Sequence, residues 1–452
     1  MGQMLPGGLS WRRLTSKGTY FLTMFMQNTN SAESPGWEML VTGTSPSTSV
    51  TISVNKSNFM KTVKVGKGET VTIEIPNPLE KKGTGLSPRS ISIKASAEIT
   101  VMTRNYKKTS GDVASIYPVD QWGVEYYIIT PYNGPSNQYT EFGVLASDTA
   151  TSVTMVLSGA VQFNGKNYQK GDTLTVNLEP SQFVQVQSKD DLSGTKVTSQ
   201  YPTAVLSGHT CAPSNGGGCG HVYEQLKPVE SWGTSYFIPG LSFQSEYDQV
   251  YVMAPKATCI HHQSGGQKVK TNIAAGNVMR VNVSASSPFS IHSNDRIQIL
   301  FNGRGGKNKG KSFGPFLTKI PDIDSFDLSF NLIRQEDFDN NMAVMIAKTS
   351  SAPGITLNGN ALQNAKWTEF PESEYSWAEY DYGSDSSSNR VQHPTSPFGL
   401  LSIGYSMNKA YGSVAPDIQA PGASLPEPIG NNSKTLSGKS KLTAKFLDDD
   451  KK

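Results

Sequence analysis

The sequence predicts an all-β fold of four tandem antiparallel β-sandwich-like modules, joined by linkers of the pattern Pro-Val-acid-x-Trp-Gly. The first observation is a repeat: the stretch Pro118–Ile128 returns as Pro228–Ile238, 110 residues later, with Pro, Val, an acid, Trp, Gly, Tyr and Ile in one register. The second is the recurrence of short runs that alternate apolar and hydroxyl residues, the period of half-buried strands. A repeat of this length fits one compact domain per copy.

Composition places limits on the class of protein. A chain of 452 residues predicts about three or four domains. Charged residues make up only 17 % and the net charge is +3, so no strong field favours nucleic acid or membrane lipid. No apolar run reaches the roughly 18 residues of a membrane span, so we expect no membrane insertion. The polar, nearly neutral composition is typical of extracellular β proteins. The opening residues lack a signal-peptide pattern, which leaves either a removed leader or a cytosolic chain.

The first module is expected over residues 1–117. Ser49–Val54 alternates apolar and hydroxyl residues. Two further alternating runs, Thr62–Val65 and Thr70–Ile75, flank the turn Gly66-Lys67-Gly68-Glu69 and predict a hairpin. This segment is expected to contain about seven strands and no helix.

The second and third modules, 118–227 and 228–314, repeat this hairpin. Lys170-Gly171-Asp172-Thr173 mirrors Lys67-Gly68-Glu69-Thr70 at a shift of 103 residues, and Ala275–Val281 is the third copy. Thr151–Val156 likewise mirrors Thr48–Ser53 at a shift of 103 residues, and two motifs displaced equally indicate duplication.

A fourth, divergent module is expected over 315–416. Its opening, Pro321–Phe326, stands where the earlier linkers have Pro-Val-acid-x-Trp-Gly. After Pro416 the composition shifts to Pro, Ser, Asn and Lys, so residues 417–452 are predicted to be a flexible polar tail.

The repeated linkers are interpreted as joints between modules. We expect the proline to end the preceding strand, the glycine to allow a sharp bend and the tryptophan to pack between neighbouring sandwiches. The residues predicted to form the joints are Pro118, Trp122, Gly123, Pro228, Trp232 and Gly233.

The cysteines and sequons bear on the compartment. Cys211 and Cys219 flank a glycine-rich loop and are favoured as a disulfide over two free thiols, which leaves Cys259 as a free thiol. The neighbouring His261 and His262 would point to opposite faces of a strand, so no metal site is predicted. Candidate glycosylation sites are Asn55, Asn282 and Asn431, if the chain is secreted.

One aromatic stretch is a possible interaction patch. It contains Trp367, Tyr375, Trp377, Tyr380 and Tyr382, interleaved with carboxylates. Such residues can stack on sugars, flank a glycosidic bond or form a protein interface, and they can also pack within an ordinary loop, the interpretation we favour.

No catalytic site or cofactor is predicted. The six histidines accompany no Gly-x-Ser-x-Gly nucleophile motif. Gly305–Ser312 satisfies the phosphate-loop pattern, but Phe313-Gly314-Pro315-Phe316 cannot begin the helix that such a loop requires, so we interpret it as a solvated linker.

Five short segments carry a family resemblance. Met26-Gln27-Asn28, Ser207–Cys211 and His221–Val229 resemble the amino-terminal region of IgGFc-binding proteins, as do Pro315–Thr318 and Pro397–Tyr405. The resemblance covers roughly residues 18–415 and implies a large secreted glycoprotein of mucus and extracellular matrix. Immunoglobulin binding is not carried over, because no Fc-contacting residue can be aligned.

Together these observations predict a non-enzymatic, secreted matrix, mucus or adhesive component that binds extracellular macromolecules through its surfaces. One alternative is a structural protomer that self-assembles into an extracellular fibre or homopolymer. Another is a carbohydrate-binding lectin.

Overall fold

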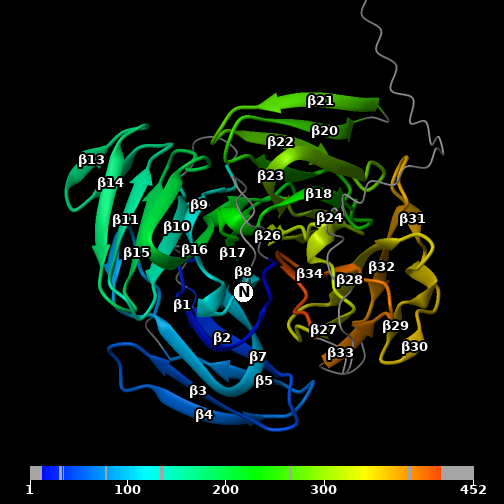
Figure 1. The fold of residues 1–452 in the computed structure, drawn as a ribbon, viewed down its shortest axis with the longest axis horizontal. Helices are drawn as coiled ribbons and strands as arrows, with labels where there is room; N and C mark the ends of the chain where they lie inside the picture. The colour runs from blue at the N-terminus through cyan, green and yellow to red at the C-terminus, as the bar shows by residue number, and fades with distance from the viewer. Residues whose placement is uncertain are drawn as a thin grey trace, which may run out of the picture. The chain divides into compact units, whose positions relative to one another are not determined.

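Antiparallel strands form nearly all of the regular structure in the computed structural model, which describes residues 13–29, 33, 35–76, 79–132, 137–264, 267–383 and 388–418 (Figure 1). The helical segments among these residues are four 3-10 turns of three residues each. The all-β prediction is confirmed. Most of the predicted tail, with Asn431, lies outside the described residues.

The first curled sheet is organised on one long strand, β7. Its order is β4-β3-β7-β2-β5, and β1 and β8 also pair with β7. The first half of β7 pairs with β1 and β3, and the second half pairs with β2 and β8. The strands are β1 (Lys17–Thr23), β2 (Gly36–Gly43), β3 (Thr48–Val54), β4 (Met60–Val65), β5 (Thr70–Glu74), β7 (Ile91–Lys107) and β8 (Ser110–Ile116).

The second curled sheet has the same order around its own long strand, β16. It runs β14-β11-β16-β10-β15, with β9 and β17 paired to β16, and β6 (Gly85–Ser87) extends it beyond β15. Strands β12 and β13 form a small separate hairpin and lie between β11 and β14 in the sequence. The strands are β9 (Gly123–Tyr127), β10 (Thr140–Ala146), β11 (Thr151–Val156), β12 (Val161–Phe163), β13 (Lys166–Tyr168), β14 (Thr173–Leu178), β15 (Phe183–Ser188), β16 (Lys196–Pro213) and β17 (Cys219–Gln225).

The third curled sheet repeats the order as β21-β20-β23-β19-β22, with β18 and β26 paired to β23. The segment with the phosphate-loop pattern forms a two-stranded hairpin, β24 and β25, and no helix follows it. The strands are β18 (Gly233–Ile238), β19 (Asp248–Met253), β20 (Thr258–Ser264), β21 (Gln267–Ile273), β22 (Val278–Val283), β23 (Phe289–Gly303), β24 (Gly306–Asn308), β25 (Lys311–Phe313) and β26 (Phe316–Lys319).

The fourth region differs, because it has two sheets without a shared long strand. Their orders are β27-β33-β29-β30 and β31-β32-β28-β34-β35. The strands are β27 (Ser329–Ile333), β28 (Asn340–Lys348), β29 (Thr356–Leu357), β30 (Asn360–Ala361), β31 (Thr368–Glu369), β32 (Tyr375–Asp381), β33 (Ser388–Gln392), β34 (Gly399–Ser406) and β35 (Lys409–Val414). The 3-10 turns are η1 (Val119–Gln121), η2 (Val229–Ser231), η3 (Ile323–Ser325) and η4 (Ala352–Gly354).

Four strands, one from each region, meet at the centre of residues 13–418. Strand β8 contacts β17, β17 contacts β26, β26 contacts β35, and β35 contacts β8. Figure 1 shows β8, β17 and β26 close together, between the groups of outer strands. The contacts therefore form a closed cycle that brings the first and fourth regions together.

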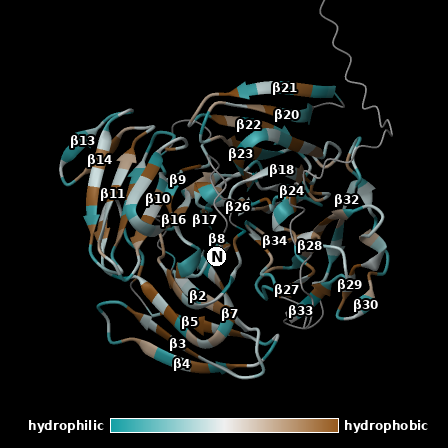
Figure 2. Cartoon of the chain, in the orientation of Figure 1, coloured by the Kyte–Doolittle hydropathy of each residue, from teal (hydrophilic) through white to brown (hydrophobic). Residues whose placement is uncertain are grey.

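Outer strands alternate in hydropathy while inner strands are buried on both sides. The burial of β14 alternates residue by residue, whereas every residue of β8 and β15 is buried. Figure 2 shows hydrophilic and hydrophobic residues mixed along the outer strands. One face of each outer strand therefore supplies the core, as expected for a half-solvated antiparallel sheet.

The apolar clusters lie where successive sheets meet. The first joint core contains Phe21 and Ile52 of the first sheet with Phe183 and Leu206 of the second. The second joint core combines second-sheet residues with Tyr251 and Leu317 of the third.

The third joint core combines third-sheet residues with Val344 and Leu401 of the fourth region. Between the fourth region and the first sheet lies a smaller closing core, which consists of Leu40, Met102, Val113, Ile333, Phe338 and Tyr411. The four cores follow the cycle of the central strands.

Candidate functional site

The two Trp-Gly segments have the same geometry. Pro118 and Pro228 each precede a 3-10 turn, and Trp122 and Trp232 each follow one. The Trp122 indole donates to Tyr117 O at 3.2 Å, and the Trp232 indole donates to Lys227 O at 2.9 Å. Each indole N–H is thus bonded to the backbone five residues earlier, which leaves the rings free to pack.

Both tryptophans lie in joint cores. Trp122 is 3 % exposed and belongs to the first joint core, and Trp232 is fully buried in the second. Phe326 follows the third turn, η3, and lies in the third joint core. An aromatic side chain after each of these three turns, η1, η2 and η3, therefore packs where two sheets meet.

The glycines allow a close approach between segments. Neither Gly123 nor Gly233 has a φ in the left-handed region. A Cβ on Gly123 would collide with Pro228, and one on Gly233 would collide with Asp322. Each glycine therefore makes room for the following Pro-acid segment, and the expected sharp bend stays a prediction.

A tyrosine hydroxyl links each Trp-Gly segment to its sheet by hydrogen bonds. The Gly123 amide donates to Tyr126 Oη at 2.9 Å, and that hydroxyl donates to Thr203 O at 2.6 Å. Tyr236 makes the equivalent bonds from Gly233 N and to Ile297 O, at 3.0 and 2.7 Å. These buried bonds fix the first strand of each sheet against its long strand.

A buried aspartate ties the four central strands together. Asp112 on β8 accepts hydrogen bonds from Leu317 N on β26 at 2.9 Å, Tyr223 N on β17 at 3.4 Å and Gly412 N on β35 at 3.3 Å. Burial raises the pKa of Asp112 well above its usual value, against the lowering effect of the amides of Leu317 and Val113. Asp112 thus contacts every other central strand, a position suited to holding the cycle closed.

An ion pair crosses between β17 and β26. Lys319 Nζ lies 2.7 Å from Glu224 Oε1 and donates to Gln225 O at 2.9 Å. Burial raises the pKa of Glu224 and lowers the pKa of Lys319, while their pairing opposes both shifts. Removal of one partner would leave the other buried without compensation.

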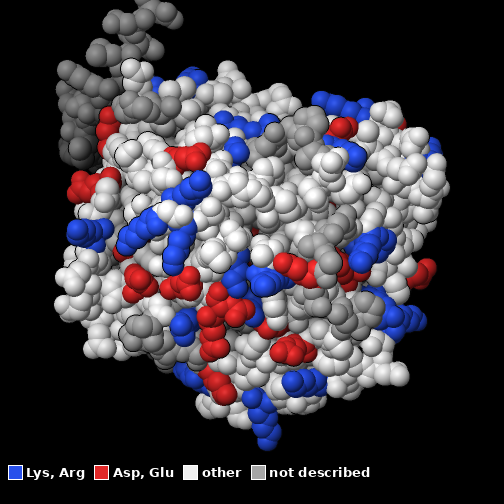
Figure 3. Space-filling view, turned by 180° about the vertical axis from the view of Figure 1, so that it is seen from behind, with Lys and Arg blue, Asp and Glu red and all other residues white. Residues whose placement is uncertain are grey.

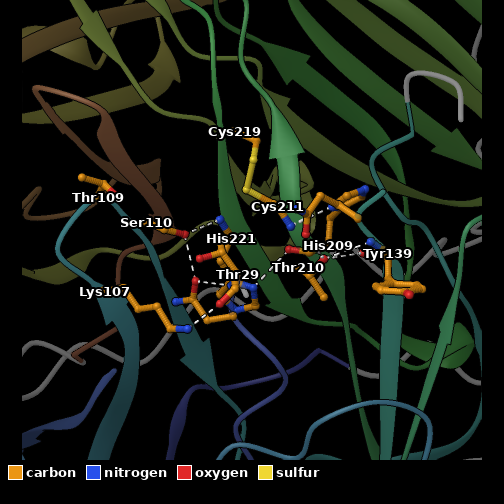
Figure 4. Close-up of a disulfide and its surroundings, with 12 residues drawn as sticks. Thr29, Lys107, Thr109, Ser110, Tyr139, His209, Thr210, Cys211, Cys219 and His221 are labelled. Atoms are coloured by element: carbon orange, nitrogen blue, oxygen red, sulfur yellow. Dashed lines mark hydrogen bonds between the residues drawn. A yellow bond between two sulfur atoms is a disulfide. The ribbon is translucent and has the colours of Figure 1, made fainter. Parts of the chain in front are cut away.

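The disulfide connects the end of β16 to the start of β17. Cys211 and Cys219 are joined, as Figure 4 shows. Cys211 is 4 % exposed, and its amide donates to His209 Nδ1 at 2.9 Å. The bridge therefore closes the loop above a set of buried polar side chains.

His221 is the centre of that polar set. Its Nδ1 lies 3.1 Å from His209 O, and its Nε2 lies 3.1 Å from Asn105 Nδ2. Its amide donates to Ser110 Oγ at 2.7 Å (Figure 4). Burial lowers the pKa of His221 to about 3, so the ring is neutral at neutral pH.

Glu141 is the last member of this polar set, and its contact with His221 is too long for a strong hydrogen bond. Its Oε1 is 3.7 Å from His221 Nδ1, and its Oε2 accepts from Gln187 Nε2 at 2.7 Å. Burial raises the pKa of Glu141 well above its usual value. A neutral imidazole beside a buried carboxyl whose pKa is raised forms a structural hydrogen-bond network.

Three of the segments that carried the family resemblance converge on this network. Asn105 Nδ2 donates to Met26 O at 3.0 Å, and Asn28 Nδ2 donates to Asn105 Oδ1 at 3.2 Å. His209 and His221 come from the other two segments. Asn105, Asp112 and Lys319 were not singled out from the sequence, because only the fold brings them to the centre.

The aromatic stretch does not form one exposed surface. Trp377 is 7 % exposed in the third joint core, and Tyr382 is 3 % exposed in a separate cluster with Leu332 and Met345. Trp367, Tyr375 and Tyr380 are half-buried. Five aromatic rings are therefore not presented together to a sugar or a partner.

The described glycosylation candidates differ in accessibility. Asn55 is half-buried, and its Nδ2 lies 3.5 Å from Ser181 O. Asn282 is exposed on β22, an edge strand. On the face in Figure 3, acidic and basic residues are interspersed, in keeping with the small net charge.

Comparison with known proteins identifies the family. A family model described as IgGFc binding protein matches residues 112–404. This chain belongs to the IgGFc-binding family. The resemblance that the sequence segments indicated is confirmed.

The human IgGFc-binding protein is 34 % identical over 398 residues, which cover 87 % of this chain and 7 % of the human protein. This IgGFc-binding family chain thus matches a small part of that relative's length. A structure of a 1.5-MDa bacterial ice-binding adhesin covers 65 % of this chain and 97 % of its own, with 12 % identity and a TM-score of 0.11. Within the described residues, no helix is long and apolar enough to cross a bilayer.

Proposed function

We propose that this chain is a non-enzymatic, secreted binding protein that acts through its surfaces as a matrix, mucus or adhesive component. Family membership and the human relative support an extracellular binding role. The observation that carries the proposal is that buried ionisable groups stabilise the fold. Asp112, Glu224 and Lys319 form hydrogen bonds between strands. Groups committed to holding the fold leave recognition to the exposed faces.

We also propose that four related units, residues 1–117, 118–227, 228–314 and 315–416, form the chain, with a polar tail over 417–452. The strand order shared by three sheets supports this division. Two strands cross the proposed borders, because β6 pairs with β15 and β26 pairs with β23. Such exchange strengthens the attachment of each unit to the next.

The partner we propose is an extracellular glycoprotein, and the relative's name makes the Fc fragment of immunoglobulin G the first probe. Surface plasmon resonance on the immobilised chain should show saturable binding of human Fc and none of the matched Fab fragment. Equal signals from both fragments, or none from Fc, would remove the Fc fragment as the partner.

Extracellular placement has its own test. In protein taken from its natural source, Cys211 and Cys219 should be oxidised, because a reducing compartment keeps such thiols free. We further propose a glycan at Asn282, whose exposed side chain meets the first requirement for modification. Reduced cysteines together with an unmodified Asn282 would contradict secretion.

Self-assembly is a second candidate, favoured by the small closing core. If the contact between the fourth region and the first sheet opens, the same surfaces can join two chains, since exchange of identical elements is a low-cost route to oligomers. Light scattering after size-exclusion chromatography tests this: a monomer at every concentration would exclude the fibre. Lectin activity is less favoured, because Trp377 and Tyr382 are buried.

A further inference from the structure

One exposed face of the third sheet brings a thiol and two imidazoles together. Cys259 and His261 are two residues apart on β20, so their side chains project from the same face. His292, on β23, is the direct antiparallel partner of His261. Side chains directly opposite in an antiparallel pair have Cβ atoms about 4.5–5.5 Å apart, so His292 shares this face.

The separation of the first two groups matches that of two ligands of one metal ion. Cys259 Sγ lies 3.6 Å from His261 Nε2. A tetrahedral Zn²⁺ with Zn–S of about 2.3 Å and Zn–N of about 2.0 Å holds its sulfur and nitrogen ligands about 3.5 Å apart. The two atoms therefore need little movement to share an ion.

His292 can supply the third ligand. Its Nδ1 lies 3.1 Å from Ser235 Oγ, which leaves Nε2 available. A hydrogen bond at the second ring nitrogen is the usual way in which a protein orients a histidine ligand.

His262 does not belong to this group. Its Nε2 lies 3.3 Å from Thr271 Oγ1, and it projects from the opposite face of β20. The second histidine of the group is therefore not the adjacent His262. It is His292, which lies 31 residues after His261 in the sequence, on the neighbouring strand β23.

We propose that Cys259, His261 and His292 bind a divalent metal ion that accepts sulfur and nitrogen ligands, such as Zn²⁺, with water as the fourth ligand. Within the described residues, no three His, Cys, Asp or Glu side chains already converge as a metal site. Binding therefore requires the exposed His292 ring to turn toward the other two groups. This inference concerns a different surface from the joints and does not depend on the proposed partner.

Cobalt substitution on the full chain tests the site. Titration with Co²⁺ should give a thiolate-to-cobalt charge-transfer band that saturates at one ion per chain and is removed by added Zn²⁺. Because Cys211 and Cys219 are joined, Cys259 is the free thiol among the described residues. The band should be absent in Cys259→Ser.

The histidine variants separate this site from other arrangements. His292→Ala should weaken Co²⁺ binding by at least about tenfold, since even a group that only orients a ligand contributes about 10- to 100-fold. His262→Ala is the matched control and should bind like the unmodified chain. No band in the unmodified chain, or equal binding in His292→Ala, would overturn the proposal.

Discussion

The three joints between successive regions differ from the contact that closes the cycle. Each successive joint has an aromatic side chain, Trp122, Trp232 or Phe326, inside a large apolar core shared by two sheets. The closing contact has a six-residue core and is completed by ion pairs and polar bonds. The closing contact therefore differs from the successive joints mainly in the small size of its apolar core.

The polar part of the closing contact involves both ends of the described chain. Arg104 Nη2 on β7 lies 3.2 Å from Asp337 Oδ2, and Arg13 Nη2 lies 2.8 Å from Asp327 Oδ2. Asp417 accepts a bond from Ser16 N at 3.0 Å and also bonds the Ser16 hydroxyl. Charged contacts that water can reach contribute little each. The closing contact is therefore the place where we expect the cycle to open first.

The largest expected effect comes from removing a joint tryptophan. Trp232→Ala and Trp122→Ala should each lower the free energy of unfolding by about 3–5 kcal/mol, the cost of deleting a large buried aromatic. Urea unfolding followed by circular dichroism measures this. Trp367→Ala, which alters a half-buried tryptophan, is the control and should lose much less. Equal losses of unfolding free energy in all three variants would show that a joint tryptophan contributes no more than a half-buried one.

A somewhat smaller effect is expected at the central ion pair. Lys319→Met should cost about 3 kcal/mol, because it leaves Glu224 buried and unpaired. The double change Glu224→Gln with Lys319→Met should recover most of that loss in the same unfolding experiment. No recovery would show that packing of Lys319, rather than charge, determines the cost.

The closing contact should respond to Arg104. We expect Arg104→Ala to cost about 1–2 kcal/mol, since it removes both a largely buried bond to Glu38 within the first sheet and the bond to Asp337 that crosses the closing contact. Hydrogen exchange should rise in β8 and β35 and remain unchanged in β18. Raised salt should produce a weaker form of the same change in the unmodified chain. Exchange that increased equally in all strands would contradict a local opening.

The smallest effect concerns Asp327 and pH. Burial raises its pKa, and Asp417 raises it further, against the lowering effect of Arg13. A carboxyl whose folded pKa exceeds its unfolded value of about 3.9 contributes most below that value, and the contribution is lost as pH rises through the folded pKa. Asp327→Asn should therefore be neutral or slightly stabilising at pH 7, by less than about 1 kcal/mol. A clear loss at pH 7 in urea unfolding would show that the Arg13 pair outweighs burial.

The sequence predicted the strand-rich class, because alternation is a local signal. The hairpin expected from Thr62–Val65 and Thr70–Ile75 is wrong, since β4 pairs with β3 and β5 pairs with β2. The cycle of central strands was not predicted, since contacts such as Asp112 with Leu317 join residues far apart in the chain. One signal was overlooked: Pro416-Asp417-Ile418 repeats Pro321-Asp322-Ile323. Asp417 bridges to Phe330 as Asp322 bridges to Tyr236, so this copy marks the closing contact.

The pairing of His261 with His292 shows the same limit. A strand's neighbours are set by the sheet, and the sequence alone offered only the adjacent His262. The aromatic stretch 367–382 likewise looked continuous, yet Trp377 on β32 and Tyr382 just after that strand pack in different cores.

Closure of the cycle can be measured most directly by a cross-link between the first sheet and the fourth region. Ser115 Oγ and Ser413 Oγ are 2.8 Å apart, although 298 residues separate them in the sequence. With Cys259→Ser as background, the double change Ser115→Cys and Ser413→Cys should form a disulfide within single chains, identified by mass spectrometry of the linked peptides. Two free thiols in the monomer, or linked peptides found only in dimers, would contradict a cycle closed within one chain.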